Sequence, residues 1–183
     1  MRCFIFAFVF CFSVLAHNNY AANTDTYSKQ YYNDHDAIYK IFPKTSSYSK
    51  KIVELSLEIK QDIEKKLGFR ITNTNLTFYK IYSEDKLIGY SLVLDEKGKY
   101  KPITFMTGIT PDLRVKDIVV MIYREKIGSE VRKSRFLRQF KNKTQSDSLV
   151  VDKNVMGISG ATISTWSVVM GVRRALVIIG HLI

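Results

Sequence analysis

The sequence Asn75-Leu-Thr-Phe-Tyr-Lys-Ile-Tyr82 alternates polar and apolar side chains along most of its length, and three later segments repeat this period. These segments, residues 87–94, 102–108 and 115–123, are separated by short polar stretches. A period of two is typical of strands that bury one face, and short polar turns join neighbouring antiparallel strands. The sequence therefore predicts a mainly antiparallel meander sheet at the centre of the fold.

Apolar residues recur at helical spacing on both sides of this meander. The predicted helices span residues 34–42, 49–67, 129–140 and about 163–179. Pro43 ends the first of them, and Gly68 is placed to cap the C-terminus of the second. The predicted class is therefore α+β, with helices flanking the sheet at its N- and C-terminal ends.

The composition bounds the chemistry of the chain. Its 183 residues, of which 46% are hydrophobic and 25% charged, are typical of one globular domain, and the formal net charge is +11. Both cysteines, Cys3 and Cys11, precede the region of predicted helices and strands. Disulfide frameworks, cysteine-ligated zinc, iron–sulfur clusters and cysteine-attached haem are therefore excluded for that region.

The known catalytic motifs have little support. The sequence has no dinucleotide-binding glycine motif, no phosphate-binding loop and no zinc-protease motif. The histidines, His17, His35 and His181, lie at the chain ends or in the first predicted helix, so a catalytic triad has no suitable base. Glu125 and Glu130 are interpreted as solvated charges rather than as a glycosidase pair. We therefore predict no catalytic residue and no metal ligand.

The N-terminus has the pattern of a secretory signal. Residues 3–16 form an uninterrupted apolar run after Arg2, shorter than the roughly 20 residues that a membrane-spanning helix needs. Residues 1–16 are predicted to be a signal peptide cleaved after Ala16, with Ala21 as a second candidate. An uncleaved N-terminal anchor is the alternative. Residues 17–33 are then a polar linker and residues 34–183 the domain, located in the periplasm or on the outer face of the cytoplasmic membrane.

No later segment is expected to be long and apolar enough to form a second membrane span.

A cluster of basic residues follows the predicted sheet. Its members share the third predicted helix and the residues after it: Arg132, Lys133, Arg135, Arg138, Lys141 and Lys143. A solvated helix face, a docking surface for an anionic protein or membrane, and a nucleic-acid site are the three interpretations. Phe136 and Phe140 are four residues apart, so a helix would bury them rather than offer them to bases, and no nucleic-acid partner is expected.

Small residues surround a hydroxyl directly before the last predicted helix. Ser159, Gly160 and Ala161 would let another molecule approach the backbone, and Thr162 would lie in the first turn of the helix. Unpaired N–H groups and the positive end of the helix dipole favour a phosphate at such a position. The hydroxyl could carry a phosphoester. A plain helix N-cap formed by Ser159 or Thr162 is the alternative.

The segment Ser159-Gly-Ala-Thr-Ile-Ser164 resembles the flavinylation motif D-x-x-[ST]-G-A-[ST] of the FMN-binding domain family. This family includes the covalent-flavin subunits of Na⁺-translocating NADH:quinone reductase and Rnf complexes. Further segments match small exported members of the family in the same order, so the resemblance covers about residues 34–179. These segments are residues 41–43, 89–90, 101–104, 123–131, 135–140 and 171–175.

The resemblance implies FMN bound as a phosphoester to Thr162 and attached by an FAD:protein FMN transferase. It implies that the other residues of the motif surround the phosphate. It also implies that a loop after the last predicted strand contacts the edge of the isoalloxazine ring. The implied cofactor residues besides Thr162 are Ser159, Gly160, Ala161, Ser164, Glu125, Ile127 and Gly128. Met156 stands where the motif has its leading acid, which leaves noncovalent FMN or an unmodified relative as alternatives.

The resemblance also implies a function. A domain of this kind would be an exported electron-transfer flavoprotein, with redox proteins of the membrane or periplasm as donor and acceptor. Two other functions remain open. One is a flavin-dependent reductase of a small acceptor, and the other is a binding domain without flavin.

Overall fold

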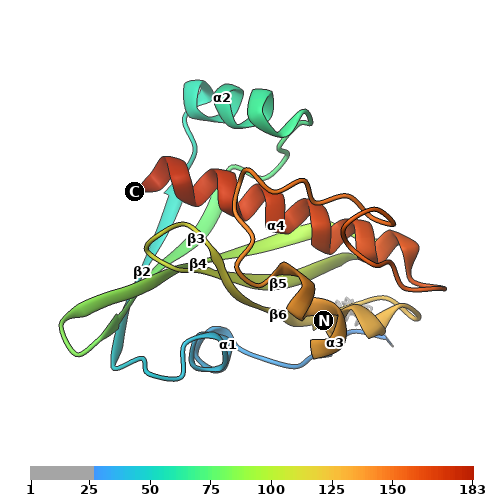
Figure 1. The fold of residues 1–183 in the computed structure, drawn as a ribbon, viewed down its shortest axis with the longest axis horizontal. Coiled ribbons are helices and arrows are strands. Elements are labelled where there is room, and N and C mark those ends of the chain that lie inside the picture. Colours follow the sequence, from blue (N-terminus) through green and yellow to red (C-terminus); the bar gives the residue numbers. More distant parts are fainter. Residues whose placement is uncertain (1–26) are drawn as a thin grey trace, which may run out of the picture.

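The computed structural model describes residues 27–183, and its centre is a six-stranded antiparallel sheet with the order β1-β6-β5-β4-β3-β2 (Figure 1). The four predicted strands are the consecutive strands β3 to β6, so the predicted meander is confirmed. The bounds of the strands are β1 (Lys29–Gln30), β2 (Ser47–Glu54), β3 (Asn75–Ser83), β4 (Lys86–Lys97), β5 (Pro102–Ile109) and β6 (Val115–Tyr123).

Helices cover both faces of this sheet, which confirms the α+β class. The long helix α4 crosses one face and α1 lies on the opposite face, while α2 packs beside α4 (Figure 1). Each face has its own apolar core, one against α4 and one against α1. The helices are α1 (Asp34–Ile41), α2 (Leu57–Leu67), α3 (Ser134–Leu137) and α4 (Thr162–Leu182), with 3-10 turns η1 (Ser129–Arg132) and η2 (Arg138–Phe140) around α3.

Helix α4 is the central element of the larger core. By length and composition it could cross a membrane, contrary to the prediction that no later segment could, but 72% of its apolar window is buried within the molecule. Gly171 allows α4 to lie close to the sheet, because a Cβ at this position would collide with the ring of Phe105 on β5. The hydroxyl of Ser167 donates to the carbonyl of Lys97 at the end of β4 (2.6 Å). These contacts fix the position of the helix along the sheet.

A buried ion pair also joins α4 to β4. Arg174 Nη1 lies 2.7 Å from Glu96 Oε1, and the Phe69 ring centroid lies 5.3 Å from the Arg174 guanidinium. Burial raises the pKa of Glu96 to about 7, although Arg174 acts in the opposite direction. The desolvation of the carboxylate therefore outweighs the attraction of its partner.

The prediction of one helix over residues 49–67 is wrong in its first half. Residues 47–54 form β2, which pairs with β3 from Ser47 opposite Tyr82 to Glu54 opposite Asn75. Ser56 then caps α2 through a hydrogen bond from the Ile59 N–H to its hydroxyl (3.3 Å). Ile52, in β2, happens to precede Leu55 and Ile59 at the spacing of a helix face. Pairing with β3 overrides this local pattern. Gly68 ends α2 with a φ of 76°, as predicted.

The predicted basic helix over residues 129–140 is divided into η1, α3 and η2. Lys133 is the point of division, because its extended backbone (φ −71°, ψ 138°) separates η1 from α3. Phe136 and Phe140 are buried as predicted, with their rings 5.5 Å apart.

The N-terminal predictions fall largely outside the described residues. The signal peptide over residues 1–16 and residues 17–26 of the linker are not among them. The end of the predicted linker contributes β1, which pairs with the end of β6. Lys29 and Gln30 are therefore part of the sheet and not of a free linker.

The Glu96–Arg174 pair predicts a pH dependence of stability. Because the pKa of Glu96 is raised to about 7, the folded protein keeps a proton that the unfolded chain has already lost. Unfolding free energy should fall as the pH rises from about 4.5 to 7, by at most about 1.4 kcal/mol per pH unit from this group. Glu96→Gln should remove this contribution and be the more stable protein at pH 8. Urea unfolding between pH 4.5 and 8 measures both effects.

Glu130→Gln, in an exposed pair with Lys133, is the matched control and should keep the wild-type pH dependence. If Glu96→Gln had a lower unfolding free energy than wild-type protein at pH 8, Arg174 would instead be holding the Glu96 carboxylate in its ionised form.

Candidate functional site

Thr162 is the first residue of α4, and its side chain is exposed. Ala161 is the N-cap residue, and no side chain caps the helix. The first backbone bond of the helix runs from the Thr165 N–H to the Ala161 carbonyl (2.8 Å). The N–H groups of the first turn therefore point out of the helix without a side-chain acceptor, which favours an anion there. The alternative of a plain N-cap formed by Ser159 or Thr162 finds no support in this geometry.

The turn before Thr162 leaves space beside its hydroxyl. Ser159 and Gly160 are exposed, whereas Ala161 is buried. Gly160 has a φ of 77°, and a Cβ at this position would meet no atom within 4 Å. A glycine in the left-handed region without neighbouring side chains allows a ligand to approach the backbone.

The loop after β6 lies against the same end of α4. A Cβ on Gly128, whose φ is 90°, would lie 2.9 Å from the Ser164 hydroxyl and 3.3 Å from the Ala161 Cβ. Two predicted groups of site residues, distant in sequence, are therefore neighbours in space. Only a residue without a side chain fits between them.

Tyr123, the last residue of β6, joins these two segments and was missed by the sequence analysis. Its hydroxyl donates to the Ile127 carbonyl (2.6 Å) and shares a hydrogen bond with the Ser164 hydroxyl (2.9 Å). Burial raises the pKa of Tyr123, so the phenol keeps its proton at neutral pH. Ser164 is buried and holds the loop against the helix through Tyr123. The position of Tyr123 at a strand end directly before the predicted loop was the available signal.

The carboxylate of Glu125 is directed at the turn between β4 and β5. Its Oε1 accepts hydrogen bonds from the backbone N–H groups of Tyr100 (2.6 Å) and Lys101 (2.9 Å), and the residue is buried. Ile127, two residues later, is 64% exposed. The interpretation of Glu125 as a solvated charge is therefore wrong, because its buried carboxylate holds the neighbouring turn in place. Ile127 presents an apolar side chain to solvent.

Exposed apolar side chains come from the segments that meet near this end of α4. Trp166, the only tryptophan of the chain, is 44% exposed. It follows Thr162 by four residues, so both side chains lie on the same face of the helix. Sequence reasoning missed Trp166, although this spacing was visible. We use the name apolar rim for these exposed residues: Tyr100, Ile127, Met156, Ile163 and Trp166.

A basic hollow of about 600 Å³ borders the segment that leads to Thr162. Met156 and Ile158 line it, and so do three cations, Lys133, Arg135 and Arg138. The predicted basic cluster therefore reaches the neighbourhood of the motif.

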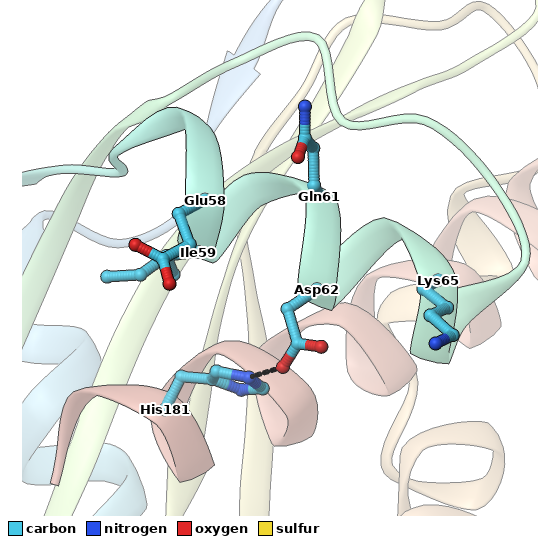
Figure 2. Close-up of a pocket in the computed structure, with 6 residues that line it drawn as sticks. All are labelled: Glu58, Ile59, Gln61, Asp62, Lys65 and His181. Carbon is cyan, nitrogen blue, oxygen red and sulfur yellow. Dashed lines mark hydrogen bonds and ion pairs between the residues drawn. The ribbon is translucent and has the colours of Figure 1, made fainter.

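The hollow in Figure 2 is a different site. It lies between α2 and the C-terminal end of α4, where His181 Nε2 is 2.8 Å from Asp62 Oδ2. Thr162 and His181 are separated by almost the whole helix, roughly 28 Å at 1.5 Å per residue. This hollow is therefore not part of the site around Thr162. Across residues 27–183 the structure contains no group of three side chains suited to hold a metal ion.

Tyr123→Phe tests the link between the loop and α4. Removing the hydroxyl leaves the buried Ser164 hydroxyl and the Ile127 carbonyl without this partner, at an expected cost of about 1–3 kcal/mol in unfolding free energy. Chemical denaturation measures this loss. Tyr90→Phe is the control, because the Tyr90 ring is buried against Phe78 and its hydroxyl makes no hydrogen bond within residues 27–183. Equal stability of the two variants would contradict a role of Tyr123 as the connecting residue.

Comparison with known proteins finds two similarities. Residues 98–177, from the turn after β4 into the second half of α4, match the model of the FMN-binding domain family. Over 116 residues the chain is 30% identical to one subunit of the proton-translocating ferredoxin:NAD(+) oxidoreductase complex of Clostridium ljungdahlii. The match covers 59% of this chain and 62% of that protein, so the chain spans less than two thirds of the relative's length. Residues 98–177 are therefore similar to the FMN-binding domain family, and this similarity supports FMN as the cofactor.

Proposed function

We propose that this chain binds FMN covalently, as a phosphoester on Thr162, and acts as an exported electron-transfer flavoprotein. The observation that carries the proposal is the exposed Thr162 hydroxyl at the uncapped N-terminus of α4. This threonine lies within the residues that match the FMN-binding domain family.

The residues around Thr162 fit such a cofactor. The free N–H groups of the first turn and the helix dipole favour the negative charge of a phosphodiester. The open side of Gly160 leaves room for it, and the apolar rim offers a surface for a flat aromatic ring. Bound FMN supplies the electron-transfer chemistry, while the protein supplies attachment, orientation and the electrostatic environment.

Redox proteins of the membrane or periplasm are the proposed donor and acceptor. The relative from Clostridium ljungdahlii is a subunit of a ferredoxin:NAD(+) oxidoreductase complex, which supports an electron-transfer role. The predicted signal peptide or anchor over residues 1–16 supports export. A covalent bond suits an exported flavoprotein because an emptied site could not be refilled from the cytoplasmic flavin pool. An FAD:protein FMN transferase is the proposed maturation partner.

A flavin-dependent reductase of a small anionic acceptor is the second candidate. The observation that favours it is the basic hollow beside Met156, where Lys133, Arg135 and Arg138 could bind a carboxylate near the flavin. Glu130, the carboxylate among the described residues that line this hollow, lies 3.8 Å from the Lys133 ammonium and is held as an ion pair. Electron transfer between proteins is the better-supported function, because the similar protein from Clostridium ljungdahlii is a subunit of an oxidoreductase complex.

Intact mass and in-gel flavin fluorescence test the covalent bond. Wild-type protein, co-expressed in exported form with an FAD:protein FMN transferase, should gain the mass of one FMN moiety and fluoresce. Thr162→Ala should lose both signals because it lacks the attachment hydroxyl. Thr72→Ala removes an exposed hydroxyl elsewhere and should keep them.

Met156→Asp restores the leading acid of the motif and adds a second comparison. A higher modified fraction in this variant would show that Met156 limits recognition by the transferase. Wild-type protein and Met156→Asp that both lack added mass and bound flavin would contradict the proposal and favour a binding domain without flavin.

Trp166 provides a measurement of where the flavin ring lies. If the ring rests on the apolar rim, Trp166 should quench flavin fluorescence by contact, because an aromatic ring stacks readily on a flat neighbour. Trp166→Phe should therefore gain the full mass of FMN but show brighter and longer-lived flavin emission. Phe69→Leu, a change of an aromatic residue that contacts Arg174, is the control and should leave the emission unchanged. Identical flavin lifetimes in wild-type protein and Trp166→Phe would place the ring elsewhere.

A further inference from the structure

The outer edge of β6 is unpaired in its middle. At one end the Tyr31 N–H donates to the Met121 carbonyl (2.8 Å), next to the two residues that pair with β1. At the other end Val115 exchanges hydrogen bonds with the backbone of Asn142 and Lys143 (both 2.8 Å). Between these points residues 117–120 have β5 on one side and, within the described part of the chain, no strand on the other.

A hollow of about 730 Å³ opens onto this unpaired segment. Asp117, Ile118, Val119 and Val120 all line it. The side chains of Ile118, Val119 and Val120 are buried in the cores on the two faces of the sheet. The strand therefore presents its backbone edge to the hollow. The Ile118 N–H donates to the side chain of the preceding Asp117 (2.9 Å), a local bond that a strand carbonyl could replace.

The rim of the hollow is strongly basic. Five cations line it, against one carboxylate, that of Asp117, which pairs with Lys141 (2.9 Å). The Arg132 guanidinium lies over the ring of Tyr31 at 4.6 Å from its centroid, which holds this cation at the rim. The cations are Lys40, Arg132, Lys133, Arg138 and Lys141. An occupant should therefore carry several negative charges.

We propose that this edge receives an extended acidic segment of a partner protein, which adds to the sheet as a strand beside β6. Main-chain hydrogen bonds to the free edge would give affinity, and acidic side chains would meet the surrounding cations. A lipid surface or a nucleic acid offers no row of alternating N–H and C=O groups, so neither can use the strand edge. The combination of an open edge with a basic rim favours a peptide over both.

The N-terminal residues that the structure describes do not cover the open segment. β1 runs antiparallel to β6, with Lys29 opposite Tyr123 and Gln30 opposite Ile122. The chain after β1 leaves the edge to enter α1 at Asp34, and the open segment is left free.

The proposed surface does not include Thr162 or the apolar rim, and its test needs no flavin. Lys133 and Arg138 also line the hollow beside Met156, so a partner held here would lie close to the flavin site. Failure of this proposal would leave the assignment of Thr162 untouched, and failure of flavinylation would leave this surface intact.

The test measures binding of a fluorescent acetylated octapeptide of alternating Glu and Thr to the full chain in nonionic detergent. Wild-type protein should bind it, with an affinity that falls as salt rises. The double variant Arg132→Gln/Arg138→Gln should weaken binding about tenfold or more. The double variant Lys65→Gln/Lys66→Gln removes the same charge from α2 and should bind like wild type.

A second peptide separates strand addition from simple charge attraction. The same octapeptide with alternate backbone nitrogens methylated keeps every charge but loses main-chain donors, and it should bind much more weakly. The parent peptide should shift the backbone amide resonances of residues 117–120. Equal binding of both peptides, or equal binding by both double variants, would overturn the proposal.

Two further outcomes would also overturn it. One is binding to vesicles of phosphatidylcholine and phosphatidylglycerol through Arg132 and Arg138 with no binding of the peptide, which indicates a membrane surface. The other concerns amide hydrogen exchange at residues 117–120 in the absence of peptide. Slow exchange in the full chain that becomes fast when residues 1–26 are removed would indicate that the chain covers its own edge.

Discussion

The packing of α4 across the sheet is the constraint on which the rest of the structure depends. Gly171 lets the helix approach Phe105, while Ser167 and Arg174 bind it to the end of β4. With the helix fixed in this way, its first turn emerges beside the loop that follows β6. The exposed Thr162 is thus held by a rigid element, whereas a threonine in a mobile loop would leave an attached cofactor without a defined orientation.

The two proposed surfaces share the segment after β6. This segment begins at Tyr123, which ties the loop to Ser164, and continues through α3. Lys133 and Arg138, which flank α3, line both hollows. One hollow borders the approach to Thr162, and the other opens onto the free edge of β6. Attachment of a cofactor and docking of a partner would therefore use neighbouring parts of one basic region. Such closeness suits electron transfer, in which the distance between partners decides the rate.

Several features could be predicted from the sequence because their causes are local. Strand alternation in β3 to β6, the left-handed cap at Gly68 and the small residues before α4 all depend on neighbouring residues. The helix predicted over residues 49–67 was wrong because Ile52 and Leu55 fit a helical spacing, whereas residues 47–54 pair with β3, which begins more than 20 residues later. A single local pattern cannot reveal such pairing.

By itself the sequence determined the class of the fold, the resemblance to the FMN-binding domain family and the place of Thr162 at the start of a helix. These follow from periodicity, glycine positions and a short motif. Only the tertiary structure decided that the Gly128 loop lies against Ser164, that Tyr123 joins them, and that the edge of β6 stays open inside a basic rim. These are contacts between segments distant along the chain, and they exist because burial of apolar surface brings those segments together.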